Sequence, residues 1–600
     1  MKSTTFQWKF KNNRFISILS IISAIFFIAI MVIFLGVVGF KSYKTIQLWG
    51  LKPWFFNFEV ADIKGGIINN LIYTLIIGLL TLVISIPLSI KTSVFVIYRL
   101  KPAQSKLAQW FFKVIGGLAS VIFALFAYIF ITKLTTFLFG FKSGFNFISL
   151  ILMFIIFNSA VLTNLLINVF NKSEFNNKTY AEENNLHESL IIYKIIFRKE
   201  KKAIFQSVFI AFVKVVGEAS AVAFLMNSND SLNIFMSASN FVESKTKTVA
   251  STITTSFFNY SSQPHVRDYL FSLSITLILF IGLINFIIRK ISLIKFTNEN
   301  EKNLIKILTN KPNHTRKGLI FHYYHLTWEY FSFIVQIGLL IFMFGSILFL
   351  GQKSFLDIEN KSSLNQTIHS SVNTLISSTI VALIIIPFSY FLSMFFNLFD
   401  RKKVIPRVIN SLILANVGIP SLVHGLFVYS VFIEFFGLTK TPNNNGSMIA
   451  GIIAVSLLLT PSLVKIWNKA FKKREKLLLV AYNNNATQNE ILWQYKIKPM
   501  LPTVFNIFTL TYILFLAETS SLLLTAGTVN SPTYSLLYSQ QTLNTRMMWA
   551  LNSNDAYKEQ MMLQTAHISV LASTLLSTLN FFITPIIEGK CKPKIHVLQY

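Results

Sequence analysis

The sequence has little of what a soluble protein of its size requires. Only 13% of its 600 residues are charged, 53% are hydrophobic, and the mean hydropathy is +0.57. A soluble chain of this length would need far more polar surface to cover its core. Cysteine is almost absent, because Cys591 is the only one. A disulfide within the chain is therefore excluded, and no thiolate cluster is available for a metal.

The signatures of enzyme chemistry are missing as well. No G-x(4)-G-K-[ST] segment occurs, so the chain lacks the loop that cradles ATP phosphates in P-loop ATPases. Two carboxylates occur within apolar stretches, where a general acid and base would be one interpretation. However, no nucleophile, set of metal ligands or phosphate-cradling loop accompanies them. We therefore expect no catalytic site, no metal and no cofactor bound by this chain.

Long apolar runs are what the sequence does contain. Runs of 18 or more residues recur, and this length crosses a bilayer about 30 Å thick. We predict an all-α polytopic membrane protein with about twelve spans. Their predicted bounds are 15–40, 67–98, 112–138, 147–170, 205–229, 267–289, 330–351, 371–398, 408–436, 447–467, 504–528 and 564–586.

Basic residues are concentrated in alternate connecting segments. Most Lys and Arg lie at the N-terminus, at the C-terminal tail, and in the segments 99–113, 171–203, 289–329, 399–407 and 465–503. The positive-inside rule places this side in the cytoplasm. We therefore predict a plasma-membrane protein with both termini cytoplasmic. The charge is spread over many short loops and forms no single basic surface, so we expect no nucleic-acid partner.

The two halves of the chain repeat each other at an offset of 300 to 302 residues. The matches include polar residues and proline in one order, which apolar bias alone does not produce. Examples are Thr74 with Thr374, Pro87 with Pro387, Ser120 with Ser421, Glu218 with Glu518, Ser220 with Ser520, and Tyr193-Lys194 with Tyr495-Lys496. We predict two tandem six-helix repeats, at 1–290 and 330–600, joined by a basic cytoplasmic linker at 291–329. Parallel repeats of this kind place a pathway between them.

Two repeated cytoplasmic loops, 172–203 and 468–503, are longer than a connection requires. Each mixes apolar residues with charges, as a helix lying on the lipid surface would. Because the loop sequence is repeated in both halves, we favour a docking site for a paired cytoplasmic partner.

Several segments resemble one family, the membrane permeases of phosphate-specific (Pst) ABC importers. Residues 418–427 (GIPSLVHGLF) resemble its G-V/I-P-S-I-V-x-G-L-F signature. Residues 214–219 (KVVGEA) resemble R-A-I-G-E-T, with Lys for Arg, whereas 514–519 (LFLAET) have Leu at the basic position. Residues 518–527 (ETSSLLLTAG) look like the A-type subunit, and 217–222 (GEASAV) like the C-type.

The resemblance implies an ABC importer permease fold, with a C-type and an A-type subunit fused in one chain. It implies transport of inorganic phosphate, two copies of a separate cassette ATPase on the cytoplasmic side, and an extracellular phosphate-binding protein or lipoprotein. The chain itself would be a transporter subunit and not an enzyme. A related importer for sulfate, molybdate or an amino acid, and a secondary transporter with parallel six-helix repeats, remain as alternatives.

The importer coupling motif, E-A-A-x(3)-G, is eroded in both loops. In the first loop its glycine falls on His187 and its E-A-A on Ala181, Glu182 and Glu183, and Glu188 follows. In the second loop its glycine falls on Asn489 and its E-A-A on Asn483, Asn484 and Asn485, and Glu490 and Trp493 follow. Asn tolerates the positive φ that glycine supplies, so Asn489 would preserve the turn.

The remaining candidates lie within the spans. Lys214 and Glu218 are four residues apart, so on one helix they would share a face and pair. Such a pair either positions the helix or holds a positive charge on an anion path, since ionisable residues at membrane depth are costly. Further pathway candidates are Glu518, Thr519, Ser220 and Ser520, and we expect helix kinks at Pro87, Pro387 and Pro420.

Overall fold

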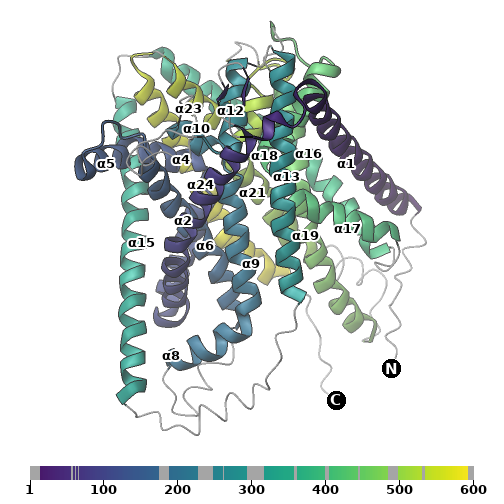
Figure 1. The fold of residues 1–600 in the computed structure, drawn as a ribbon. Coiled ribbons are helices and arrows are strands. Elements are labelled where there is room, and N and C mark those ends of the chain that lie inside the picture. Colours follow the sequence, from purple (N-terminus) through teal and green to yellow (C-terminus); the bar gives the residue numbers. More distant parts are fainter. Residues whose placement is uncertain are drawn as a thin grey trace. The chain divides into compact units, whose positions relative to one another are not determined.

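The computed structural model describes residues 14–55, 58–60, 63–64, 66–173, 188–226, 247–260, 263–293, 316–356, 361–398, 404–442, 446–483, 498–529, 534–553 and 555–591. Most of these residues lie in helices, several of them long (Figure 1). The predicted all-α class is confirmed. Strand β1 (Glu59–Val60) pairs antiparallel with β2 (Ile63–Lys64), and this small hairpin is the only sheet in the described part of the chain.

The chain divides into two compact units. Unit 1 comprises Met1–Leu48, Arg267–Ile275 and Asp357–Tyr600, and unit 2 comprises Trp49–Val266 and Thr276–Leu356. Almost all of α1 (Arg14–Trp49) therefore belongs with the helices of the second sequence repeat, and α15 (Arg316–Leu356) belongs with those of the first. The division into sequence repeats at 290 and 330 stays a prediction.

Unit 2 holds most of the helices of the first half. They are η2 (Lys52–Trp54), α2 (Ile67–Val94), η3 (Phe95–Arg99), α3 (Pro102–Gly116), α4 (Ser120–Phe126), η4 (Ala127–Ile131), α5 (Thr132–Phe139), α6 (Phe147–Ser173), α8 (Glu188–Leu190), η6 (Ile191–Ile196), α9 (Phe197–Val216), α10 (Ser220–Leu225), α12 (Val249–Tyr260) and most of α13 (Pro264–Leu293), together with α15.

Unit 1 holds most of α1 and the helices of the second half after α15. These are α16 (Lys361–Leu398), α17 (Val404–Val417), α18 (Ser421–Val428), η7 (Tyr429–Phe435), α19 (Met448–Asn483), η10 (Lys498–Met500), α21 (Leu501–Ala517), α22 (Ser520–Thr525), α23 (Leu543–Asn552) and α24 (Lys558–Cys591). Its core forms where α16, α19, α21 and α22 meet. Helix α19 contributes apolar residues three or four apart, among them Val455, Leu459 and Leu463, which therefore share one face.

The structure supports a multi-pass membrane protein but not the count of twelve spans. Ten described helices are long and apolar enough to cross a membrane, and the bent pair Val404–Val417 with Ser421–Phe435 adds an eleventh if it is one span. The predicted span 205–229 is missing because α9 begins with the charged run Arg198–Lys202 and ends at Val216. The orientation of the termini stays a prediction.

The third and fifth predicted spans of each half are broken helices. Helix α3 ends at Gly116 and α4 begins at Ser120, while the corresponding pair α17 and α18 meets at 105°. Pro420 is the N-cap of α18, so instead of kinking one helix it separates two. Proline lacks a backbone N–H and disfavours helix at the residue before it, which accounts for a break here. Pro87 and Pro387 lie inside α2 and α16, where kinks stay a prediction.

Candidate functional site

In unit 2, the break in the fifth span places Glu218 between two helices. Helix α9 ends at Val216, and Glu218 precedes α10. Its Oε1 atom accepts hydrogen bonds from the hydroxyls of Ser120 and Ser220, both at 2.8 Å. Oε1 also accepts from the backbone N–H of Ala221 at 3.4 Å. The carboxylate therefore joins the beginnings of α4 and α10, and its negative charge is stabilised by donors at two helix N-termini.

In unit 1, Glu518 has the same local geometry. Helix α21 ends at Ala517, and Glu518 Oε1 accepts from the backbone N–H of Ser521 at 3.2 Å. The N–H of Glu518 donates to Phe515 at 3.1 Å, as the N–H of Glu218 donates to Val215 at 3.2 Å. The match between Glu218 and Glu518 is thus a shared backbone break as well as a shared residue.

Polar groups without partners surround the break in unit 1. Thr519 Oγ1, Ser521 Oγ and Asn544 Oδ1 are buried and have no hydrogen-bond partner among the described residues. Asn544 itself donates to the carbonyl groups of Leu516, at 2.6 Å, and Glu518, at 3.3 Å. Unpaired buried polar atoms are costly, so sites of this kind suit water or a polar solute.

The prediction of a Lys214–Glu218 pair assumed one continuous helix. The i, i+4 rule applies within one helix, but α9 ends at Val216, between the two residues, so the rule no longer supports the pair, which stays a prediction. The Lys214 amino group lies 4.8 Å from the centre of the Phe157 ring, a cation–π contact. A role for Lys214 in an anion path stays a prediction, as it does for Ser220, Ser520 and Thr519.

A repeated threonine bond fixes the helix that follows each break. In unit 2, Thr74 Oγ1 accepts from the N–H of Val249, at the start of α12, at 3.1 Å. In unit 1, Thr374 Oγ1 accepts from the N–H of Leu543, at the start of α23, at 3.0 Å. The pair Thr74 and Thr374, noted as a repeat in the sequence, therefore performs one task in both units. Helices α12 and α23 correspond as a result.

The glycine of the signature segment lies where two helices of unit 1 approach closely. A Cβ atom added at Gly425 of α18 would lie 2.9 Å from the Cα atom of Ser521 in α22. Real Cβ atoms do not approach that closely. The corresponding residue in unit 2 is Ala124, which is fully buried in α4. A small residue at this position leaves room for α22 to approach α18 in unit 1.

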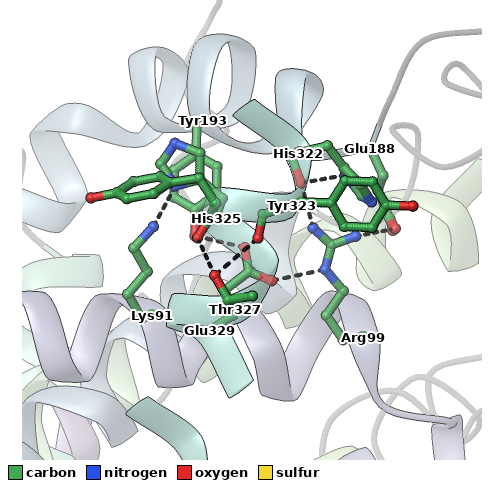
Figure 2. A network of polar contacts seen from close by, with 11 residues as sticks. Lys91, Arg99, Glu188, Tyr193, His322, Tyr323, His325, Thr327 and Glu329 are labelled. Carbon is green, nitrogen blue, oxygen red and sulfur yellow. Dashed lines mark hydrogen bonds and ion pairs between the residues drawn. The ribbon is translucent and has the colours of Figure 1, made fainter. Parts of the chain in front are cut away.

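A buried charged network joins three elements of unit 2 (Figure 2). Arg99, in η3, pairs with Glu329 of α15 at 2.8 Å and with Glu188 of α8 at 2.6 Å. The Glu329 side chain has 0% exposure, and Arg99 has 8%. A buried carboxylate requires such a partner, because its desolvation is otherwise uncompensated.

Tyrosine and histidine side chains extend this network. The Tyr193 hydroxyl donates to Glu329 at 2.8 Å, and its ring stacks on His325 with centres 4.0 Å apart (Figure 2). Burial and the nearby Glu329 carboxylate raise the pKa of Tyr193, so it stays a protonated donor. The Lys91 amino group forms a hydrogen bond with His325 Nδ1 at 2.5 Å. The segment that begins at Glu188 is thereby anchored to η3 and α15.

Of the coupling-loop candidates, Glu188 is the one that the structure describes. Glu182, Glu183, His187, Asn489, Glu490 and Trp493 lie outside the described residues. Sequence reasoning did not single out Arg99 or Glu329 as partners of Glu188. Glu329 is an acidic residue at the end of an apolar run, and this was the available signal.

Two curated proteins match nearly the whole chain. One is the "Phosphate transport system permease protein PstA homolog" of Mycoplasma pneumoniae, 22% identical over 98% of this chain and 97% of its own length. The chain is similar to phosphate-transport permeases. A protein with the same description from Mycoplasma genitalium is 23% identical over 88% of both chains. These relatives confirm the resemblance found in the sequence.

A third relative matches over a shorter stretch. The "Probable ABC transporter permease protein YqgH" of Bacillus subtilis is 30% identical over 118 residues, which are 20% of this chain and 36% of that protein. The Bacillus protein is thus little more than half as long as this chain. No family model and no solved structure matches.

Proposed function

We propose that this chain is the whole membrane permease of an ATP-driven importer for inorganic phosphate. The observation that carries the proposal is the match to a phosphate-transport permease homolog. The match extends over 98% of this chain and 97% of the homolog. An accidental likeness of apolar helices would not extend over 98% of one chain and 97% of the other. The chain forms the pathway and couples it to a separate ATPase, so it is a transporter subunit and not an enzyme.

The two repeats do the work of two permease subunits. The permease homolog from Bacillus that matches part of the chain is about half as long, which supports a fusion of two such units. Two repeats suit two copies of a cassette ATPase, docked at the loops 172–203 and 468–503 on the cytoplasmic side. An extracellular phosphate-binding protein delivers the solute from the other side.

The breaks at Glu218 and Glu518 are the proposed pathway elements. Each carboxylate accepts a hydrogen bond from the N–H of a residue in the short helix that follows it. A small displacement of that helix would break this bond, and the return movement would form it again. Lys214 offers positive charge near the end of α9, as an anion in a low-dielectric surrounding requires. The network around Arg99 and Glu329 ties the segment from Glu188 to the helices of unit 2. ATPase movement at the first loop is transmitted through it.

A solute panel tests the proposal against its alternatives. The chain is purified together with its ATPase and its binding protein, and ATP hydrolysis is measured with phosphate, sulfate, molybdate and amino acids in turn. Stimulation by phosphate is expected. Stimulation by another solute alone would assign a related importer. A chain that transports without any ATPase would be a secondary transporter.

A further inference from the structure

A buried arginine lies at the start of α23 in unit 1. The segment 539–546 (SQQTLNTR) is almost wholly polar, yet every residue in it is buried. The segment ends at Arg546, whose exposed fraction is 0%. Charged residues are almost never buried to this degree unless an opposite charge accompanies them.

The described partners of Arg546 are all neutral. Its Nε donates to Thr367 Oγ1 at 3.3 Å, and Nη2 donates to the carbonyl oxygen of Ser363 at 3.1 Å. Its Nη1 donates to the side-chain oxygens of Gln366, at 3.0 Å, and Gln541, at 3.3 Å. No ion pair to Arg546 occurs in the part of the chain that the structure describes.

Comparison with Arg99 shows that Arg546 lacks a paired carboxylate among the described residues. Arg99 is also buried, but two carboxylates pair with it. For Arg546, burial lowers the pKa to about 10, and Asp555 offsets this only at longer range. The side chain is still a cation at neutral pH. Neutral dipoles orient the guanidinium but do not neutralise its charge. The site therefore still lacks an anion.

The charge is specific to the second repeat. The threonine bonds that place α12 and α23 in register align Arg546 with Thr252. In the fifth span the difference is reversed, since Lys214 in the first repeat corresponds to Leu514 in the second. At these two aligned positions each repeat thus has one cation and one uncharged residue, and the two cations lie on different elements. Gln366, which bonds Arg546, is exposed, so the guanidinium lies one side chain below the surface of unit 1.

We propose that Arg546 binds the transported oxyanion where it enters unit 1, on the side predicted to face outward. The planar guanidinium matches two oxygens of a tetrahedral anion such as phosphate. Gln366 and Gln541 hold the guanidinium in the empty state and yield to the anion. This inference rests on the proposed function and adds to it a binding residue in the second repeat.

The decisive variant is Gln366→Glu, which has nearly the same shape and places a carboxylate beside Nη1. The chain with its ATPase and binding protein is reconstituted in proteoliposomes, and the maximal rate of ATP-driven uptake of radioactive phosphate is measured with the melting temperature of the complex. If Arg546 binds the anion, the new carboxylate competes with it. Uptake then falls by about tenfold or more, the size expected for one lost charge-assisted bond, while the melting temperature holds or rises. If Arg546 only joins helices, the new ion pair leaves both uptake and stability intact.

Two further variants complete the test. Arg546→Gln should lower uptake as strongly, and Arg546→Lys should retain part of it. The control Lys440→Gln removes an exposed positive charge from the same unit and should leave uptake unchanged. Should Arg546→Gln fail to assemble, the Gln366→Glu result decides. If Gln366→Glu takes up phosphate at the parent rate, the role of Arg546 is wrong but the proposed function stands. If the parent complex itself takes up no phosphate, both the proposed function and the role of Arg546 are wrong.

Discussion

At the residue scale, Glu218 and Glu518 each hold the start of a short helix by a side-chain hydrogen bond. Each carboxylate accepts a hydrogen bond from the backbone N–H of the residue three positions later. Any oxygen acceptor of the same shape would fix this geometry. The negative charge is therefore more than the fold requires, and its role in transport stays a proposal.

Glu218→Gln separates the charge from the shape. Glutamine keeps an acceptor at the position of Oε1, so the chain should assemble with its ATPase in normal amounts. Phosphate uptake should fall by about tenfold or more, because one ionised partner in a low-dielectric site is lost. Glu559→Gln, at an exposed position of α24, is the matched control and should transport normally. Normal uptake by Glu218→Gln would show that the carboxylate only caps a helix.

Some of this site could be predicted from the sequence, and the reasons for the rest are physical. The repeat predicted the correspondence of Glu218 and Glu518, because matched polar residues survive in apolar helices. The spacing of Lys214 and Glu218 could not predict their geometry, since the i, i+4 rule presupposes a continuous helix and Gly217 ends it. Arg99 and Glu329 are 230 residues apart in sequence, so no local pattern predicts their contact.

At the element scale, each unit contains a short helix that follows the break in its fifth predicted span. Helices α10 and α22 have six residues each, too few to be stable by themselves. They persist because α4 and α18 pack on them and because a carboxylate caps each one. Their sequences were predicted as continuations of long spans, since apolar composition does not indicate where a helix is interrupted.

Gly425→Ala tests the close approach of α18 to α22. The added methyl group would meet the backbone of Ser521, and overpacking of this kind costs about 1–3 kcal/mol. The melting temperature of the purified chain should fall. Gly36→Ala, in α1 of the same unit, meets nothing within 4 Å and should be neutral. An equal effect of both substitutions would contradict the packing described here.

Arg99→Gln tests the network that anchors the coupling segment. Glu329 would be left buried without its cation, at a cost of about 3–5 kcal/mol. Hydrogen exchange should become faster in 188–196, and less ATPase should co-purify. The double variant Arg99→Met with Glu329→Leu removes both charges and should regain much of the stability. A single variant with unchanged exchange would show that the network does not hold the segment.

At the scale of the whole molecule, the predicted topology places both termini in the cytoplasm. A cysteine at position 440 should then react with an impermeant thiol reagent from outside, and one at position 106 only after the membrane is opened. Both Lys440 and Lys106 are exposed. Because Cys591 is buried, its own reactivity does not report on topology, and it is replaced by serine in both variants. The reverse labelling pattern would show that the chain has the opposite orientation in the membrane.

The central claim is that this single chain is the entire permease of a phosphate importer. The most direct measurement is the uptake of radioactive phosphate into proteoliposomes that contain this chain as the sole permease, with its ATPase and binding protein. We expect phosphate to accumulate against its gradient when ATP is supplied, and uptake to stop without ATP. Accumulation only after a second permease chain is added, or no accumulation of phosphate, would contradict it.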